Sequence, residues 1–286
     1  MSEYVRRYPA LSLLILSSLL AILPILLVAT GVLPPSLSQL GALSASAAGV
    51  ILAAIENKKE GVKELLTRGL IWRAGIGWWG FALLFTGVVS IATLALYNTF
   101  FDQQISLSGV VPWYDIFSMV IILTIFAGFG EEFGWRGYLL PRLQTRYTAL
   151  NASLIIGAFH TLWHLPMFFM EGQTQHDWVQ AIGLFPSLIG YGAFVTAWAI
   201  QYTWIFNNTN GSVLLPAVVH GVGNLWIGGY FDIHGRTGIS GSLILTAIMA
   251  IASLLIVILA GPVNLSRSKA RQKLEVSAAQ LMGAES

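Results

Sequence analysis

Three ionisable side chains, Glu131, Glu132 and Arg136, follow the apolar run 117–129 without a break. Glu132 and Arg136 are four residues apart, so on a helix they share one face and can form an ion pair. Glu131 lies about 100° around the helix from Glu132 and has no local partner. A carboxylate inside a membrane is costly and marks function by default, and an unpaired one suits a general base. The alternative is a cytoplasmic loop in which water solvates both carboxylates.

Two histidines, His160 and His164, stand four residues apart in the apolar stretch 150–170. This spacing places both imidazoles on one helix face, and histidines so spaced can bind zinc, as in helices with the pattern H-E-x-x-H. The catalytic glutamate of that pattern is absent between them. The competing interpretation is a pair of histidines hydrogen-bonded to the backbone, which suits His160 alone better than it suits both.

A third pair, His220 and Asn224, shares a helix face in the stretch 212–230. Both side chains can donate hydrogen bonds, so together they could hold a developing oxyanion in a dry site. Polar contact between membrane helices is the ordinary alternative. Taken alone, the pair favours that alternative.

The elements that must position these side chains are membrane helices. Charged residues make up only 10% of the 286 residues and the mean hydropathy is +0.72, whereas soluble domains carry about 25% charged residues. The chain has no cysteine, which excludes disulfides, thiolate metal sites and cysteine nucleophiles. A helix needs about 20 apolar residues to cross a bilayer. We therefore predict an all-α, polytopic membrane helical bundle with about eight transmembrane helices, at residues 10–32, 36–55, 76–98, 114–138, 150–170, 181–205, 212–230 and 239–261.

The distribution of basic residues supports this number of spans. If the N-terminus lies inside and the chain crosses eight times, fourteen of the fifteen Lys and Arg residues fall inside and only Arg236 falls outside, as the positive-inside rule requires. We predict a multi-pass integral protein of the cell (plasma) membrane with both termini cytoplasmic. We expect transmembrane helices and a cytoplasmic connector over 1–110, a catalytic core over 111–262, and a basic, then polar, cytoplasmic tail over 263–286, which would bind anionic lipid and not nucleic acid.

Three predicted spans thus place carboxylates or imidazoles at comparable depth in the membrane. Lipid offers such groups no partners, so they must meet one another. A base carboxylate, imidazoles and donor side chains that converge in one cavity are what the hydrolysis of an amide by activated water requires. This combination favours an enzyme.

The same segments resemble the CPBP family of intramembrane endopeptidases, also called Abi or CAAX-protease-like. This family includes the type II CAAX prenyl endopeptidases and bacterial bacteriocin-processing and immunity proteins. Its first motif is E-E-x-x-x-R and its third is H-x-x-x-N. The residues that match these two motifs are Glu131, Glu132 and Arg136, and His220 and Asn224.

The second motif of the family, F-x-x-x-H, often continues as H-L-P. It aligns best with His164, which Leu165 and Pro166 follow. His160 then stands at the aromatic position, which is a departure from the family pattern. The other frame, with His160 as the motif histidine, places Ile156 at the aromatic position and loses H-L-P.

The resemblance implies proteolysis within the membrane. In the family's pattern, Glu131 with His164 would activate water, and His220 with Asn224 would stabilise the tetrahedral oxyanion. The supporting residues would be Glu132, Arg136 and His160.

The motifs fit two versions of this chemistry. In a metal-dependent version, Glu131, His164 and His220 would bind zinc and leave an open position. In a metal-free version, Glu131 is the general base. His160 is an additional candidate ligand and favours the metal slightly.

Two other functions fit an intramembrane Glu and His cluster. One is a proton-coupled transporter, in which such residues form a relay, although the internal repeats of many transporters are not visible here. The other is a non-catalytic membrane immunity or scaffold protein that retains the motifs. For the enzyme, we expect a peptide or protein substrate, membrane-anchored or prenylated, and no nucleic acid.

Overall fold

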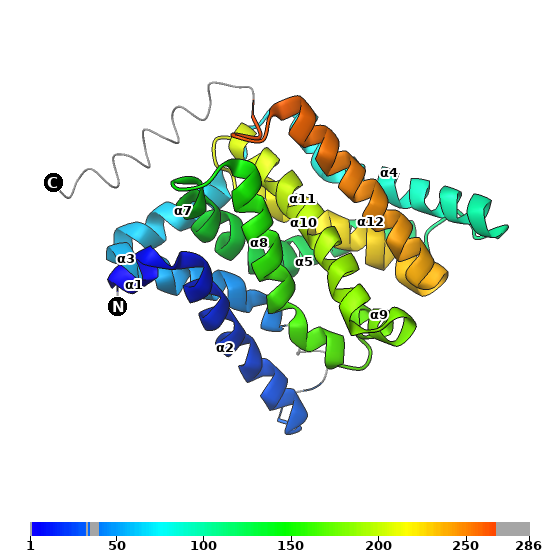
Figure 1. Cartoon of the computed structure of the whole chain (residues 1–286), viewed down its shortest axis with the longest axis horizontal. Coiled ribbons are helices and arrows are strands. Elements are labelled where there is room, and N and C mark those ends of the chain that lie inside the picture. Colours follow the sequence, from blue (N-terminus) through cyan, green and yellow to red (C-terminus); the bar gives the residue numbers. More distant parts are fainter. Residues whose placement is uncertain (1, 33, 35–39, 267–286) are drawn as a thin grey trace.

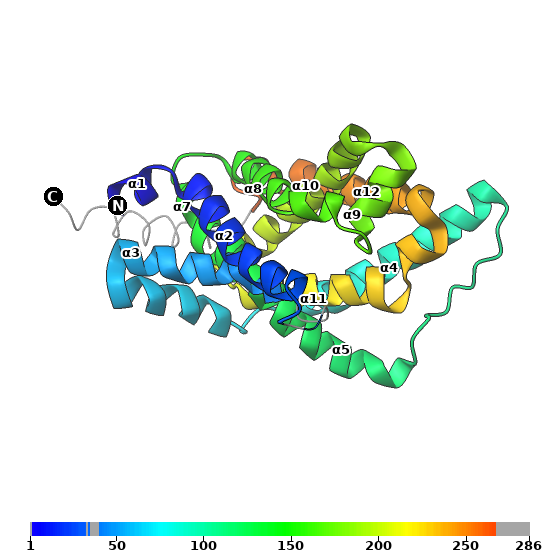
Figure 2. The ribbon, with the colours of Figure 1, turned by 90° about the horizontal axis from the view of Figure 1, so that it is seen from below.

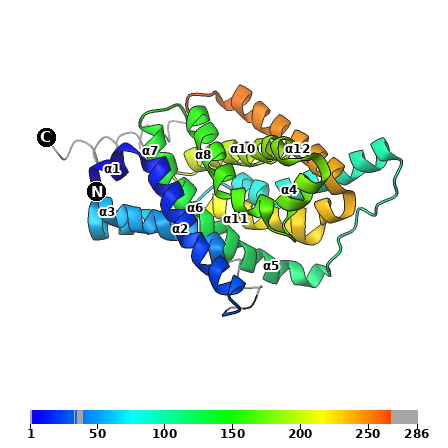
Figure 3. The ribbon, with the colours of Figure 1, turned by 60° about the horizontal axis from the view of Figure 1, so that its bottom comes forward.

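The computed structural model describes residues 2–32, 34 and 40–266, and these residues form helices and loops with no strand among them. The predicted all-α class is confirmed. Helix α10 lies between α8 and α12 (Figure 1), and α6 lies between α3 and α11 (Figure 3). The helices are α1 (Ser2–Arg7), α2 (Pro9–Ala29), α3 (Ser44–Thr67), α4 (Ile76–Phe101), α5 (Ile116–Leu123), α6 (Gly130–Glu132), α7 (Leu140–Gln144), α8 (Ala149–Trp163), α9 (Thr174–Ile182), α10 (Leu184–Asn208), α11 (Leu214–Asn224) and α12 (Ile233–Ala260). Short 3-10 segments are η2 (Arg68–Leu70), η3 (Trp113–Asp115) and η6 (Leu165–Phe169), and π-helical segments are η4 (Thr124–Phe129), η5 (Phe133–Leu139) and η7 (Leu225–Tyr230).

Six helical stretches among the described residues are long and apolar enough to cross a membrane. The prediction of about eight transmembrane helices is therefore confirmed only in part. The predicted span 150–170 is shorter because α8 ends at Trp163, just before Pro166, which cannot continue an α-helix. The predicted span 212–230 holds the short helix α11 and the π-helical segment η7. The six stretches are Pro9–Val28, Leu40–Leu70, Ile76–Phe101, Trp113–Gln144, Leu184–Asn208 and Ile233–Ala260.

Helix α3 consists of two helical halves that lie side by side (Figure 2). The chain turns at Asn57 and Lys58, where the backbone leaves helical geometry and φ reaches 50° at Lys58. The first half corresponds to the predicted span 36–55, of which residues 36–39 lie outside the described residues. The second half lies in the predicted connector 56–75.

Three segments that were predicted to lie inside meet at one end of the molecule, and two of them contribute basic residues there. Arg6 donates to the carbonyl oxygen of Glu56 at 3.1 Å, and Arg146 donates to the carbonyl oxygen of Arg7 at 2.9 Å. Arg236, the basic residue predicted outside, instead donates to carbonyl oxygens of the loop between α4 and α5, which extends at the end far from α1 (Figure 2). Among the described residues, Arg236 therefore lies at the end opposite Arg6 and Arg146. The predicted tail 263–286 lies outside the described residues from 267 onward.

Buried apolar side chains form two large clusters, and the candidate site lies where they meet. One cluster joins α2 and α3 to η5 and α8, and the other joins α4 to α10, α11 and α12. Trp135 of the first cluster stacks on His160, with ring centroids 4.7 Å apart. Tyr202 of the second stacks on His220, with centroids 5.9 Å apart. Each cluster therefore fixes one imidazole of the site.

Small residues let α3 approach the helix that carries the two glutamates. At Gly134 an added Cβ would overlap the carbonyl oxygen of Ala45, and at Gly49 it would lie 3.0 Å from the Cα of Gly134. The hydrophobic effect does not drive helices together in lipid, because the lipid tails are themselves apolar. Close backbone packing of this kind is therefore a main source of helix association in membranes.

We expect Gly134→Ala to destabilise the protein by about 1–3 kcal/mol, because the backbone of α3 cannot give way as a side chain would. Thermal unfolding in detergent would measure the loss. Gly80→Ala is the matched control, because an added Cβ there meets nothing within 4 Å. Equal melting temperatures for the two variants would contradict the close-packing account.

Candidate functional site: a buried carboxylate and imidazole centre

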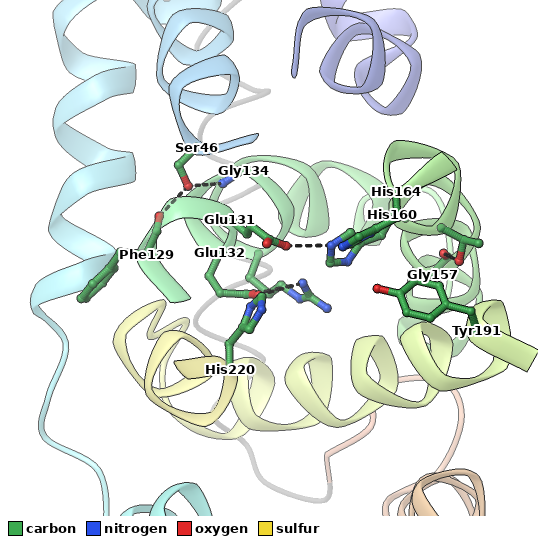
Figure 4. Close-up of polar contacts among 12 residues, drawn as sticks. Ser46, Phe129, Glu131, Glu132, Gly134, Gly157, His160, His164, Tyr191 and His220 are labelled. Atoms are coloured by element: carbon green, nitrogen blue, oxygen red, sulfur yellow. Dashed lines mark hydrogen bonds and ion pairs between the residues drawn. The ribbon is translucent and has the colours of Figure 1, made fainter. Parts of the chain in front are cut away.

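Glu131 and Glu132 lie in α6, a single turn between the π-helical segments η4 and η5. π-Helical turns are rare and occur frequently at functional sites. Ser46 of α3 bonds to the backbone on both sides of this turn (Figure 4). Its Oγ donates to the carbonyl oxygen of Phe129 at 2.7 Å and accepts from the backbone nitrogen of Gly134 at 3.3 Å. Helix α3 thereby holds the turn that carries both carboxylates.

The side chain of Glu131 is hydrogen-bonded across the bundle to α8. Its Oε2 lies 2.8 Å from Nε2 of His160, and both residues are only 6% exposed (Figure 4). An ionised carboxylate only accepts, so the partner nitrogen of His160 carries the proton. Nδ1 of His160 is buried and has no hydrogen-bond partner among the described residues. The carboxylate that the sequence left without a local partner thus finds one on another helix.

His164 lies half-buried at the end of α8, beside His160, with ring centroids 4.8 Å apart. Its Nδ1 lies 2.9 Å from the carbonyl oxygen of His160. Because a carbonyl oxygen only accepts, Nδ1 carries the proton and Nε2 of His164 presents a lone pair. An imidazole in this state can accept a proton from water or bind a metal ion.

Glu131, His160 and His164 each place one possible ligand atom within 4.8 Å of those of the other two. A carboxylate oxygen with two imidazole nitrogens is a ligand set that zinc accepts. Histidines that bind a metal through one ring nitrogen usually donate a hydrogen bond from the other, which fixes the orientation of the ring. Nδ1 of His164 makes such a bond to a backbone carbonyl. The three residues therefore fit a metal ion, and His160 occupies the place that the motif comparison assigned to His220.

A second buried cluster surrounds Glu132, which is fully buried. Its carboxylate lies 3.0 Å from Nη1 of Arg136 and 2.8 Å from Nδ1 of His220. Arg136 is also fully buried, and its guanidinium lies over the ring of Tyr202 at 4.5 Å. The predicted pair Glu132 and Arg136 forms as expected, and His220 joins it from α11. One carboxylate is thus shared by a cation and an imidazole.

The last predicted pair, His220 and Asn224, lies on one helix but differs in burial. Asn224 lies one turn beyond His220, at the end of α11, and is exposed. Two residues that the sequence did not single out also lie at the site. The ring of Tyr191, on α10, meets that of His164 edge to face. Gln175, on α9, donates a hydrogen bond to the hydroxyl of Tyr191. No local pattern marks these two, because they reach the site only through the packing of α10 against α8 and of α9 against η6 and α10.

Helices of membrane-spanning length around buried Glu and His side chains define a class, the polytopic membrane proteins with an ionisable centre. Comparison with known proteins narrows this class. Residues 112–226 match the family described as type II CAAX prenyl endopeptidase Rce1-like. Within this segment the chain is similar to that family, which agrees with the resemblance predicted from the motifs.

A relative is the CAAX prenyl protease 2 of Methanococcus maripaludis, which is 32% identical to this chain over 127 residues. The similar region covers 43% of this chain and 45% of that protein. The chain therefore matches less than half of its relative's length.

We expect Arg136→Met to destabilise the protein by about 3–5 kcal/mol, because it leaves the buried carboxylate of Glu132 without its cation. Arg68→Met is the matched control: Arg68 pairs with Glu64 at the same spacing, but Glu64 is 40% exposed, and loss of such a pair costs at most about 1 kcal/mol. Unfolding in detergent with increasing denaturant would measure both.

The double variant Arg136→Met with Glu132→Gln should recover part of that loss, because no uncompensated charge remains buried. If Arg136→Met cost no more than Arg68→Met, the buried pair would not hold the site together.

Proposed function

We propose that this protein is an intramembrane endopeptidase, similar to a CAAX prenyl protease, in which Glu131 and histidines activate water to hydrolyse a peptide bond. The observation that carries the proposal is the buried 2.8 Å hydrogen bond between Glu131 and His160. A carboxylate and imidazoles in a water-poor site can move a proton between water and a leaving group. The similarity of residues 112–226 to the endopeptidase family supports the same chemistry.

In this proposal, Glu131 with His164 takes one proton from a water molecule as the water oxygen attacks the peptide carbonyl carbon. The proton then passes to the leaving nitrogen as the C–N bond breaks. His220 and Asn224 are assigned to the oxyanion that forms in between. The supporting residues are Glu132, Arg136 and His160.

A zinc ion is compatible with this site. Glu131, His160 and His164 would hold it, with His220 as the further candidate that the family motifs indicate, and zinc would supply a Lewis acid to the peptide carbonyl. In the metal-free version Glu131 alone is the general base, and the imidazoles orient the water.

The proposed substrate is a peptide or protein, either membrane-anchored or carrying a prenylated C-terminal Cys-a-a-X sequence. The proposed setting is the cell membrane, with both termini cytoplasmic and substrate entry from the cytoplasmic side. The position of Arg6, Arg7 and Arg146 together at one end of the molecule supports this orientation. We propose no nucleic-acid partner.

We expect Glu131→Ala to lower the rate of peptide cleavage by about 10²–10⁴-fold, the range that a general base contributes. The assay would use protein purified in detergent and a fluorogenic peptide that ends in a farnesylated cysteine and three further residues. Glu60→Ala, at an exposed position of α3, is the control and should cleave like the wild type.

Equal rates of cleavage by wild type and Glu131→Ala would contradict the proposed endopeptidase mechanism. A wild type that cleaves nothing, but carries protons across liposome membranes in a Glu131-dependent way, would favour a transporter. Absence of both activities would favour a non-catalytic immunity or scaffold protein.

We expect the purified protein to bind zinc, and His160→Ala and His164→Ala each to lower the bound zinc measured by elemental analysis. His220→Ala should retain zinc, since His220 bonds to Glu132 and not to the Glu131 group. Treatment with a chelator, followed by zinc, would then test whether cleavage depends on the ion. A wild type that binds no zinc yet cleaves the peptide would favour the metal-free version.

A further inference from the structure

We propose that the hydroxyl group of Tyr191 donates a hydrogen bond to the oxyanion of the tetrahedral intermediate at the Glu131 centre. The inference rests on the proposed function, because it assigns a role within the same reaction. It starts from a residue that no family motif contains.

Aromatic neighbours hold the ring of Tyr191 firmly. It meets His164 with centroids 5.4 Å apart, Phe168 at 5.5 Å and Trp178 at 6.2 Å, each edge to face. Its hydroxyl points toward the side of the site where His160 and His164 lie (Figure 4). The packing therefore presents the hydroxyl to the reacting groups at little cost in conformational freedom.

Gln175 determines which way the hydroxyl proton points. This residue of α9 is only 7% exposed, and its Nε2 donates to Oη of Tyr191 at 2.9 Å. An N–H donor occupies a lone pair of the phenol oxygen, so the O–H proton stays available for another acceptor. Among the described residues no acceptor is recorded for it. A buried amide thus orients a free donor into the site.

The position of the donor suits an oxyanion. Glu131 and His160 are deeply buried, whereas His164 and Tyr191 are half-buried, so a peptide would approach from the side of the latter two. The water oxygen bonds to the carbonyl carbon, Glu131 with His164 takes a water proton, and the carbonyl oxygen gains negative charge. Tyr191 keeps its own proton throughout and stabilises that charge, as a neutral phenol can at neutral pH. The donors already proposed, His220 and Asn224, lie on α11, whereas Tyr191 lies on α10. Tyr191 would therefore be an additional donor from a separate helix.

The test compares Tyr191→Phe with wild type in the cleavage of the farnesylated fluorogenic peptide. Tyr191→Phe removes only the hydroxyl, and we expect kcat to fall by about 10²–10³-fold with KM close to its wild-type value. A phosphinate analogue of the peptide, which mimics the tetrahedral intermediate, should bind Tyr191→Phe more weakly by a similar factor. Tyr97→Phe, on α4 and away from the site, is the matched control and should match wild type.

A second variant, Gln175→Glu, keeps the size of the side chain but replaces the donor by an acceptor. It should draw the hydroxyl proton of Tyr191 away from the site and lower kcat although the phenol is still present. A melting temperature near that of wild type would separate this effect from misfolding.

A Tyr191→Phe variant that retains kcat within about threefold of wild type, while Glu131→Ala is inactive, would overturn the role of Tyr191 and leave the endopeptidase in place. A larger KM with unchanged kcat and unchanged phosphinate affinity would overturn it as well. A wild type that cleaves nothing would overturn both proposals together.

Discussion

A charge buried in a membrane protein must find its partners inside the protein, because lipid offers none. Glu132 meets this constraint through Arg136 on its own helix and His220 on α11. Because Glu131 and Glu132 are adjacent in the chain, the contacts of Glu132 also set the direction of Glu131. The carboxylate of Glu131 then reaches His160 on α8. A single helical turn therefore connects three helices through two carboxylates.

The two neighbouring glutamates have different surroundings, which suit different roles. Glu132 is fully buried and paired with a cation, which suits a structural role. Glu131 has only a neutral donor as its partner and lies beside His164, whose Nε2 carries no proton. Adjacent residues on a helix point about 100° apart, so the two glutamates face different helices from one turn that Ser46 braces. Function and stability can therefore be altered separately at adjacent positions.

The parts of the site that depend on local spacing could be predicted from the sequence. Glu132 and Arg136 pair across one helical turn, as their separation of four residues indicated. The contact between Glu131 and His160 could not be foreseen, because it joins helices whose packing no local pattern encodes, and the family pattern had favoured His164. Asn224 was placed near His220 by spacing alone, but the end of α11 leaves it exposed. The number of membrane-spanning helices was also not predictable from hydropathy alone. The apolar stretches 150–170 and 212–230 are long enough, but α8 ends at Trp163 and α11 at Asn224.

The central claim is that Glu131 performs chemistry whereas Glu132 maintains the structure. It is tested most directly by measuring peptide cleavage for two variants of equal size and equal charge change, Glu131→Gln and Glu132→Gln, with thermal unfolding of the same samples. The account predicts that Glu131→Gln melts like the wild type and cleaves the peptide about 10²–10⁴-fold more slowly, and that Glu132→Gln melts at a lower temperature. A well-folded Glu131→Gln protein that cleaves at the wild-type rate would contradict it.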